Sequence, residues 1–301
     1  SCGVGNFLGL LPENMAASKL YGVELDSITG RIAKQLYPQA NITVAGFETF
    51  NRPEFFDLAV GNVPFGNYQV NDRAYNKLGF SIHNYFFAKT LDQLHHGGIL
   101  AFVTSRYTMD QKNPSVRKYL AERAELLGAI RLPNTAFQEN ANTKVVTDIL
   151  FLQKREHPVA DEPDWVHLGY TPEGFAVNQY FIDHPDMVLG KWSAENTQYG
   201  KAACTVEPIE GLSLAEQLHT AIQKIHGSWT PTAALEAQPN AQESTEPADV
   251  LPADPSVKPY SYLLIDGEVY FQDANTAVRE TNLSETASHR IRGMIALRDC
   301  T

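Results

Sequence analysis

The chain has 301 residues, of which 43% are hydrophobic and 20% are charged, as expected for a globular protein of one large or two medium domains. No apolar run is long enough to cross a membrane, no signal peptide is visible, and the three cysteines are too far apart for a disulfide framework or a metal site. These features predict a cytoplasmic protein that needs no metal ion.

The net charge of -11 is unevenly divided along the chain. Residues 1–156 hold 16 basic and 14 acidic residues, whereas residues 157–301 hold 8 and 21. Any polyanion is therefore expected to contact the first half, because the acidic second half would repel it.

Residues 1–156 alternate between strand and helix patterns. The run over 55–62 is nearly continuous in apolar residues, as in a strand covered on both faces, and an amphipathic helix over 81–96 is expected to end at Gly97 and Gly98. Strands separated by helices predict an α/β fold with a mostly parallel sheet. The predicted strands are 19–25, 41–47, 55–62, 97–105, 126–132 and 147–155, and the predicted helices are 26–38, 81–96 and 113–124.

After Glu156 the alternation weakens, and three further parts are predicted. Residues 163–227 are expected to form a smaller accessory unit. Residues 229–258 contain five prolines and too little apolar surface to offset the entropy of ordering, which predicts a disordered linker. Residues 259–301 are expected to form a hairpin about Asp266 and Gly267 and a capped helix that leads to a downstream domain.

A glycine loop lies in the opening stretch SCGVGNFLG. Gly3 and Gly5 permit a tight turn and let a ligand approach the backbone. A glycine loop between a strand and a helix suits a nucleotide-like ligand, and Glu24, about 20 residues further on, is placed to accept both ribose hydroxyls. The alternative interpretations are a plain turn and a solvated charge at a strand end.

The stretch GNVPFG, residues 61–66, ends the third visible strand, where open α/β sheets place their ligands. The Asn62 side chain and the Val63 carbonyl supply two hydrogen-bond acceptors. Pro64 stiffens the loop, and Phe65 presents a ring face for stacking. These groups match a planar base with an exocyclic amino group, and the alternative is a strand-ending turn with a core phenylalanine.

Together these stretches resemble the amino-group DNA methyltransferases that use S-adenosylmethionine, in particular the N6-adenine branch with its Asn-Pro-Pro-aromatic tetrapeptide. The resemblance covers residues 1–156 and implies a Rossmann-like class I methyltransferase sheet, mostly parallel with a late antiparallel strand, followed by a smaller C-terminal unit. It implies catalytic roles for Asn62, Val63, Pro64 and Phe65, and cofactor contacts by Cys2, Gly3, Gly5, Asn6, Phe7, Glu24, Phe47 and Glu48.

The same resemblance implies a substrate, double-stranded DNA with one adenine flipped out of the helix and stacked on Phe65. Residues 165–300 resemble, more loosely, the region after the methylase domain in large methylase–helicase polypeptides of phages and conjugative elements. The expected partner is therefore a helicase or specificity domain of the same polypeptide, in a restriction-modification, phage or mobile-element setting.

Two features depart from the family pattern. Val63 stands where the family has its first proline, so the loop loses one rigid φ angle. The family's glycine loop also follows a central strand, so the domain over 1–156 is expected to lack its first strand, either as a fragment or because a partner supplies it.

A basic cluster follows the strand over 97–105. Arg106 and Lys112 are predicted to contact DNA phosphates, and the alternative for the cluster is the solvated face of a helix. His95 and His96 are predicted to end a helix rather than to bind a metal, because no further ligands lie at a useful spacing. The other members of the cluster are Arg117, Lys118 and Arg123.

Two other functions remain open from the sequence. A methyltransferase that acts on protein glutamine or on RNA would present a similar loop, because the geometry at the target nitrogen is alike. A degenerate, non-catalytic module that binds DNA or a partner is favoured by Val63, by the missing strand and by the acidic second half.

Overall fold

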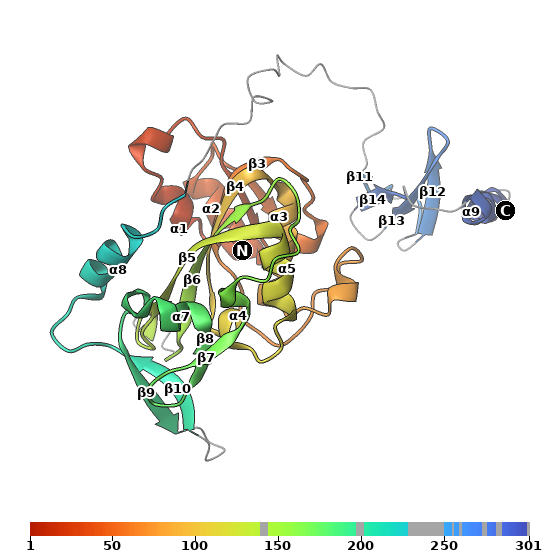
Figure 1. Ribbon diagram of the computed structural model, residues 1–301. Coiled ribbons are helices and arrows are strands. Elements are labelled where there is room, and N and C mark those ends of the chain that lie inside the picture. Colours follow the sequence, from red (N-terminus) through yellow and green to blue (C-terminus); the bar gives the residue numbers. More distant parts are fainter. Residues whose placement is uncertain are drawn as a thin grey trace. The chain divides into compact units, whose positions relative to one another are not determined.

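The first of two units carries the α/β core in the computed structural model (Figure 1). The structure describes residues 1–138, 144–196, 202–227, 250–254, 256–258, 261–272, 276–280 and 285–299. The two units are Ser1–Thr232 and Ala233–Thr301. Within the described residues, no helix has both the length and the apolar composition that a membrane span requires.

The strands and helices of the first unit follow one another in the predicted alternation up to residue 154. Its strands are β1 (Tyr21–Glu24), β2 (Asn41–Val44), β3 (Phe56–Asn62), β4 (Leu94–Ser105), β5 (Ala124–Leu132), β6 (Thr147–Lys154), β7 (Leu168–Tyr170), β8 (Ala176–Asn178), β9 (Lys191–Asn196) and β10 (Ala202–Glu207). Its helices are α1 (Asn6–Gly9), α2 (Ser27–Leu36), α3 (Ile82–Gln93), α4 (Tyr107–Asp110), α5 (Ser115–Arg123), α7 (Gln179–Asp183) and α8 (Leu214–Ile222).

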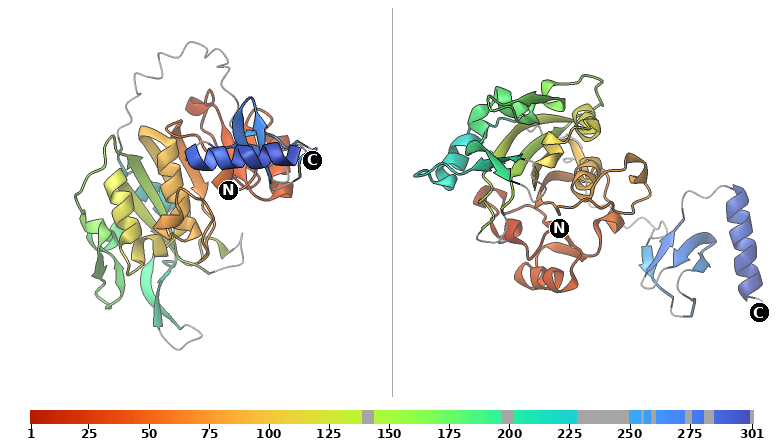
Figure 2. Two further views of the ribbon diagram at one scale, coloured as in Figure 1. Left: turned by 90° about the vertical axis from the view of Figure 1, so that its right-hand side faces the viewer. Right: turned by 90° about the horizontal axis from the view of Figure 1, so that it is seen from below.

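A four-stranded sheet in the order β3-β4-β6-β5 forms the centre of this unit. Strands β3 and β4 are parallel, whereas β6 is antiparallel to both of its neighbours, β4 and β5. Helices α3 and α5 lie side by side along the sheet, α3 on β4 and α5 on β5 (Figure 2). The predicted class I arrangement, with one late antiparallel strand, is confirmed.

A second, two-stranded parallel sheet joins β1 to β2, and α2 packs on it. Among the described strands, β3 is hydrogen-bonded to β4 alone. Leu58 and Val60 of β3 are 39% and 46% exposed. The prediction that residues 55–62 are covered on both faces is therefore wrong in this structure, because no described element covers that face.

Helix α3 is shorter than predicted and is buried on nearly all sides. It ends at Gln93, and β4 begins at Leu94, so His95 and His96 are strand residues and not a helix end. The strand begins early because Leu94 is fully buried and its carbonyl accepts a hydrogen bond from Lys154 Nζ at 2.8 Å. The buried side chains of α3 include polar ones, which the predicted amphipathic pattern does not provide for.

One hydrophobic core runs through the first unit. It includes side chains of α3 and the central sheet, and it also includes Trp165, Phe181, Met187 and Val206. The segment predicted as an accessory unit, 163–227, thus shares its core with the sheet, and it also contains the antiparallel pair of β9 and β10. The division of the first unit into separate domains stays a prediction.

The second unit contains a four-stranded antiparallel sheet in the order β11-β14-β13-β12. Strands β12 and β13 are joined by Asp266 and Gly267, both at positive φ. Most of the predicted linker 229–258 lies outside the described residues, but its part in β11 is paired with β14 instead of being disordered. The elements are β11 (Val250–Pro252), β12 (Ser261–Ile265), β13 (Glu268–Gln272), β14 (Thr276–Arg279) and α9 (Glu285–Asp299).

Candidate active site

The glycine loop turns sharply before α1. Gly3 and Gly5 have φ values of 58° and 92°, in the left-handed region that favours glycine. A Cβ atom on Gly5 would lie 2.5 Å from the ring of Tyr37, so packing also requires glycine there. A Cβ atom on Gly3 would meet nothing within 4 Å, which leaves the backbone at Gly3 open to a ligand.

Glu24 lies at the end of β1 and faces this loop. Its Oε2 accepts a hydrogen bond from the Gly3 N–H at 2.8 Å, and its Oε1 accepts one from the Asp26 N–H at 3.0 Å. The residue is 8% exposed, so it is not a solvated strand-end charge. Each carboxylate oxygen has a further acceptor position, and the ribose contact stays a prediction.

The remaining residues predicted in the loop are placed differently with respect to solvent. Cys2 is held by its N–H, which donates to the Val23 carbonyl at 2.8 Å, and burial raises the pKa of its thiol. Asn6 and Phe7, both on α1, are exposed.

Phe47 and Glu48 follow β2 in the short 3-10 helix Phe47–Thr49. The Phe47 ring stacks on Phe86, with ring centroids 4.7 Å apart, so it belongs to the aromatic packing of the core. The Glu48 side chain is exposed, and its main-chain carbonyl accepts a hydrogen bond from Lys89 Nζ at 2.9 Å. Of these two predicted cofactor contacts, Glu48 is the more accessible.

The loop 61–66 ends β3 beside the glycine loop. The Asn62 carbonyl accepts a hydrogen bond from Ser1 Oγ at 3.0 Å, and the Asn62 residue is exposed. The Val63 side chain is 4% exposed, and its N–H donates to the Val103 carbonyl at 3.1 Å. A proline at position 63 could not make that bond, so valine extends the pairing of β3 with β4 by one residue. Phe65 is 39% exposed.

The structure therefore places Asn62 and the glycine loop next to each other, as the sequence predicts for a single site. The two stretches are 61 residues apart in the chain, and they meet because β3 and β1 both end at this place. The roles of the individual residues stay predictions.

The basic cluster does not form one exposed surface. Arg117 is 1% exposed and donates to the carbonyls of Val166 and Gln111, at 2.7 and 2.8 Å, so neither the DNA contact nor the solvated helix face applies to it. Arg106 donates to the Cys204 carbonyl, and Lys112 is exposed.

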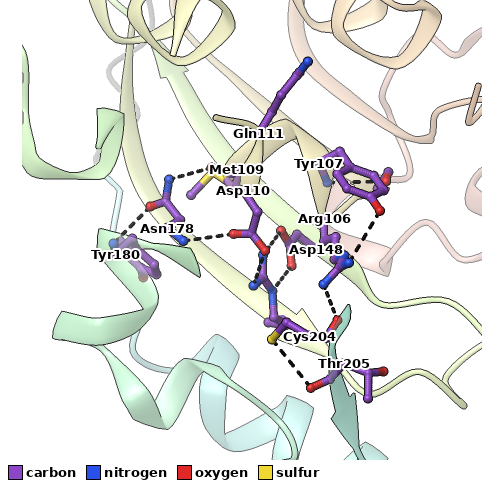
Figure 3. A network of polar contacts seen from close by, with 12 residues as sticks. Arg106, Tyr107, Met109, Asp110, Gln111, Asp148, Asn178, Tyr180, Cys204 and Thr205 are labelled. Atoms are coloured by element: carbon purple, nitrogen blue, oxygen red, sulfur yellow. Dashed lines mark hydrogen bonds and ion pairs between the residues drawn. The ribbon is translucent and has the colours of Figure 1, made fainter. Parts of the chain in front are cut away.

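A buried ionic network lies beside this cluster, and it was not predicted (Figure 3). Arg131 on β5 donates to both carboxylate oxygens of Asp148 on β6, at 2.8 Å each, and to Asp110 Oδ2 at 2.7 Å. Burial lowers the pKa of Arg131, but Asp110 and Asp148 more than offset this and raise it above its ordinary value. The signal in the sequence is a charged residue inside the apolar stretch of each predicted strand, Arg131 in 126–132 and Asp148 in 147–155.

A buried histidine beside the loop 61–66 makes stability sensitive to pH. His83 is 4% exposed, and burial lowers its pKa below the usual 6.5. The neutral ring is favoured in the folded state, so below about pH 6.5 the unfolded state binds more protons and the free energy of unfolding falls. We expect His83→Asn to lose stability less steeply than the wild type between pH 7.5 and 5.5, measured by urea unfolding.

The matched control for this experiment is His157→Asn, because the His157 side chain is 86% exposed. It should leave the pH dependence of the wild type unchanged. Equal slopes for the His83 variant and the wild type would show that His83 does not carry the effect.

Residues 7–167, more than half of the chain, match the N-6 DNA methylase family. The chain is 29% identical over 199 residues to the defense against restriction protein B of Escherichia phage P1, which covers 64% of this chain and 8% of that protein.

Matches among solved structures include a methyltransferase and a modification subunit, both named as putative. One is a putative class I S-adenosylmethionine-dependent methyltransferase of Listeria monocytogenes, with 20% identity, a TM-score of 0.45 and coverage of 54% of each chain. The other is a modification subunit of a putative type I restriction enzyme of Vibrio vulnificus, with 16% identity, a TM-score of 0.43 and coverage of 69% of this chain and 53% of that one.

Proposed function

Because the chain belongs to the N-6 DNA methylase family, we propose that it transfers a methyl group from S-adenosylmethionine to the N6 amino group of adenine in DNA. Membership of this family makes the chain a DNA methyltransferase-type domain with S-adenosylmethionine as its cofactor. The observation that carries the finer proposal is the position of Asn62, exposed at the end of β3 and bonded to the first residue of the glycine loop.

The residues around the glycine loop fit this cofactor. The open side of Gly3 leaves room for a ligand, and Glu24 faces the same loop with a carboxylate that suits ribose hydroxyls. The cofactor would supply an electrophilic methyl group on a sulfonium. The residues proposed to hold it are Cys2, Gly3, Gly5, Asn6, Phe7, Glu24, Phe47 and Glu48.

The loop 61–66 would prepare the target amine. The lone pair of an aromatic amine is delocalised into the ring, which makes the amine a poor nucleophile. Two acceptors, the Asn62 side-chain oxygen and the Val63 carbonyl, would bind the amine hydrogens, localise the lone pair and aim it. Alignment of this kind accounts for a large part of the rate in an in-line displacement. Pro64 would keep the loop stiff.

Adenine would have to leave the duplex to reach these acceptors. Flipping a base costs a few kcal/mol, roughly, and stacking on the exposed ring of Phe65 would offset part of this. Arg106 and Lys112 are proposed to contact phosphates of the same DNA, with Lys112 the more accessible of the two.

Replacing Asn62 with alanine tests the proposal. The variant is expected to lose methyl transfer by about 100-fold or more, the usual cost of removing one polar group that stabilises the transition state. The measurement is transfer of labelled methyl from S-adenosylmethionine to duplex DNA, followed by digestion to nucleosides and identification of N6-methyladenine.

The matched control is Asn51→Ala, an exposed asparagine that precedes β3 at its opposite end. It should keep wild-type activity. Undiminished transfer by the Asn62 variant would remove Asn62 from its proposed role. Methylation of RNA or of protein glutamine in place of DNA, or cofactor binding with no transfer, would support the alternative functions.

Partners and surroundings of the whole protein are also proposals. The chain spans 8% of the length of the phage protein that it matches, so further domains would act with it. A helicase or specificity domain of the same polypeptide is the proposed partner, in a restriction-modification or mobile-element setting. A longer polypeptide that contains this chain but neither a helicase domain nor a specificity domain would contradict this proposal.

One more strand is proposed to lie between β1 and β3, as the family pattern predicts. Each of these strands is paired on one side among the described residues, and Leu58 and Val60 of β3 are exposed. The Ser1 Oγ donates a hydrogen bond to the Asn62 carbonyl at the end of β3, and the Cys2 N–H donates one to the Val23 carbonyl on β1. These two residues therefore connect the ends of β3 and β1. A structure of a longer polypeptide in which the edge of β3 is empty would contradict this.

A further inference from the structure

A cavity of about 220 Å³ lies next to the loop 61–66, and none of the predicted site residues lines it. Its walls come from the segment after β3, from the start of α3, from the segment between α4 and α5, and from the first turn of α5. The lining residues are Asn67, Gln69, Gly79, Phe80, Ser81, Asn84, Gln111 and Val116.

The position of the cavity suits a substrate. Asn67 follows Phe65 by two residues, and Gln111 directly follows α4, the short helix that succeeds β4. Strands β3 and β4 are parallel, so both of these segments lie at the carboxyl edge of the sheet, where open α/β sheets bind ligands. The cavity is thus on the same edge as Asn62.

The lining is neutral and rich in amides. Four of the eight residues are asparagine or glutamine, one is serine, one is phenylalanine, and none is charged. An amide presents a donor and an acceptor side by side, which is the pattern that reads the edge of a base, and asparagine or glutamine bound to adenine is the best known case. A phosphate would instead call for cations. The volume is below the roughly 300–1,000 Å³ of sites for drug-sized ligands, as suits a single ring system.

The walls are held in place by bonds within the protein. Asn84 is 2% exposed; it donates to Ser81 Oγ at 3.1 Å and accepts from Thr108 Oγ1 at 3.2 Å. Gln69 Nε2 donates to the Gly79 carbonyl at 3.2 Å, and this bond holds the two ends of the segment 69–79 together.

Gln111 is the most adaptable part of the lining. Its carbonyl is held by Arg117, whereas its side chain is exposed and points away from the buried ionic network (Figure 3). The backbone is therefore fixed while the amide can turn to a ligand, which makes this residue the best one to change.

From these observations, and on the basis of the proposed function, we propose that the cavity binds a nucleobase of the DNA substrate that flanks the methylated adenine. The amide of Gln111 reads the edge of that base, with Asn67 and Gln69 beside it, and Phe80 supplies an apolar wall. The cavity thereby contributes to the sequence context in which adenine is methylated.

The test compares methylation contexts of the wild type and of Gln111→Ala, both in the full chain. Duplex DNA with randomised bases around adenine is incubated with S-adenosylmethionine, and N6-methyladenine is mapped by sequencing. The wild type is expected to prefer one base at a flanking position, and the variant to relax that preference by about 5- to 150-fold, the usual discrimination of one bidentate base contact. The control is Gln223→Ala, an exposed glutamine just after α8.

The possible outcomes separate this proposal from the proposed function. Methylation by the wild type with the same context profile in Gln111→Ala would overturn the base-binding role of the cavity and leave the methyltransferase assignment standing. If the wild type methylates no DNA, both proposals fail. If Gln111→Ala does not fold, as judged by thermal unfolding, Asn67→Ala decides between the same two results, because Asn67 is exposed.

Discussion

Replacing Asp148 with alanine is expected to lower the free energy of unfolding by about 3–5 kcal/mol, the usual cost of breaking a buried ion pair from one side. Arg131 and Asp148 are both 0% exposed, and two hydrogen bonds join them. Without Asp148 the guanidinium keeps Asp110 but loses its bidentate partner in a place that water does not reach. Urea unfolding followed by circular dichroism would measure the change.

A triple variant separates a charge effect from a packing effect. Arg131→Met combined with Asp148→Leu and Asp110→Asn removes all three charges of the network, and the asparagine oxygen can still accept from the Asn178 N–H, so this variant is expected to be much less destabilised than Asp148→Ala. Equal losses in the two variants would show that the broken charge network is not the cause.

The second large effect is expected for Glu24→Gln, which should weaken S-adenosylmethionine binding by about 10- to 100-fold, because bonds to charged groups are worth about 1.5–3 kcal/mol each. The glutamine amide has one oxygen in place of two, so the N–H groups of Gly3 and Asp26 and the ribose would compete for fewer acceptors. Isothermal titration with the cofactor would give the change in Kd.

The control for this measurement is Glu13→Gln, an exposed glutamate in the same region of the chain. It should bind the cofactor like the wild type. If Glu24→Gln also keeps the wild-type Kd, Glu24 holds the glycine loop alone and does not contact the cofactor.

The local parts of the site could be predicted from the sequence because their signals are short. A glycine loop followed by an acidic strand end placed Gly3 beside Glu24, and an apolar run that ends on Asn62 placed that residue at the carboxyl edge of the sheet. Both inferences depend on backbone geometry over a few residues, and the residue types of a short segment determine such geometry directly.

The parts that could not be predicted depend on distant neighbours. Arg117 belongs to a basic cluster on a helix, where the sequence suggests an exposed face. In the structure it is buried and donates a hydrogen bond to the carbonyl of Val166, 49 residues further on. Phe47 follows a strand as predicted, yet its ring stacks on Phe86 in the core of the first unit. The end of α3 was misplaced because the buried Leu94 begins a strand before the glycine pair that the sequence offers as a stop.

The Asn178 side chain has a consequence for how the first unit comes apart. It donates to the carbonyls of Met109 and Trp165, while its N–H donates to Asp110, the same carboxylate that pairs with Arg131. The segment beyond residue 163 is thereby hydrogen-bonded to the buried ionic network of the sheet, although the family match ends at residue 167. Cleavage of the backbone around Asn178 is consequently expected to unfold the methylase core instead of releasing it intact. The residues before 163 and the segment beyond it are expected to unfold in one cooperative transition.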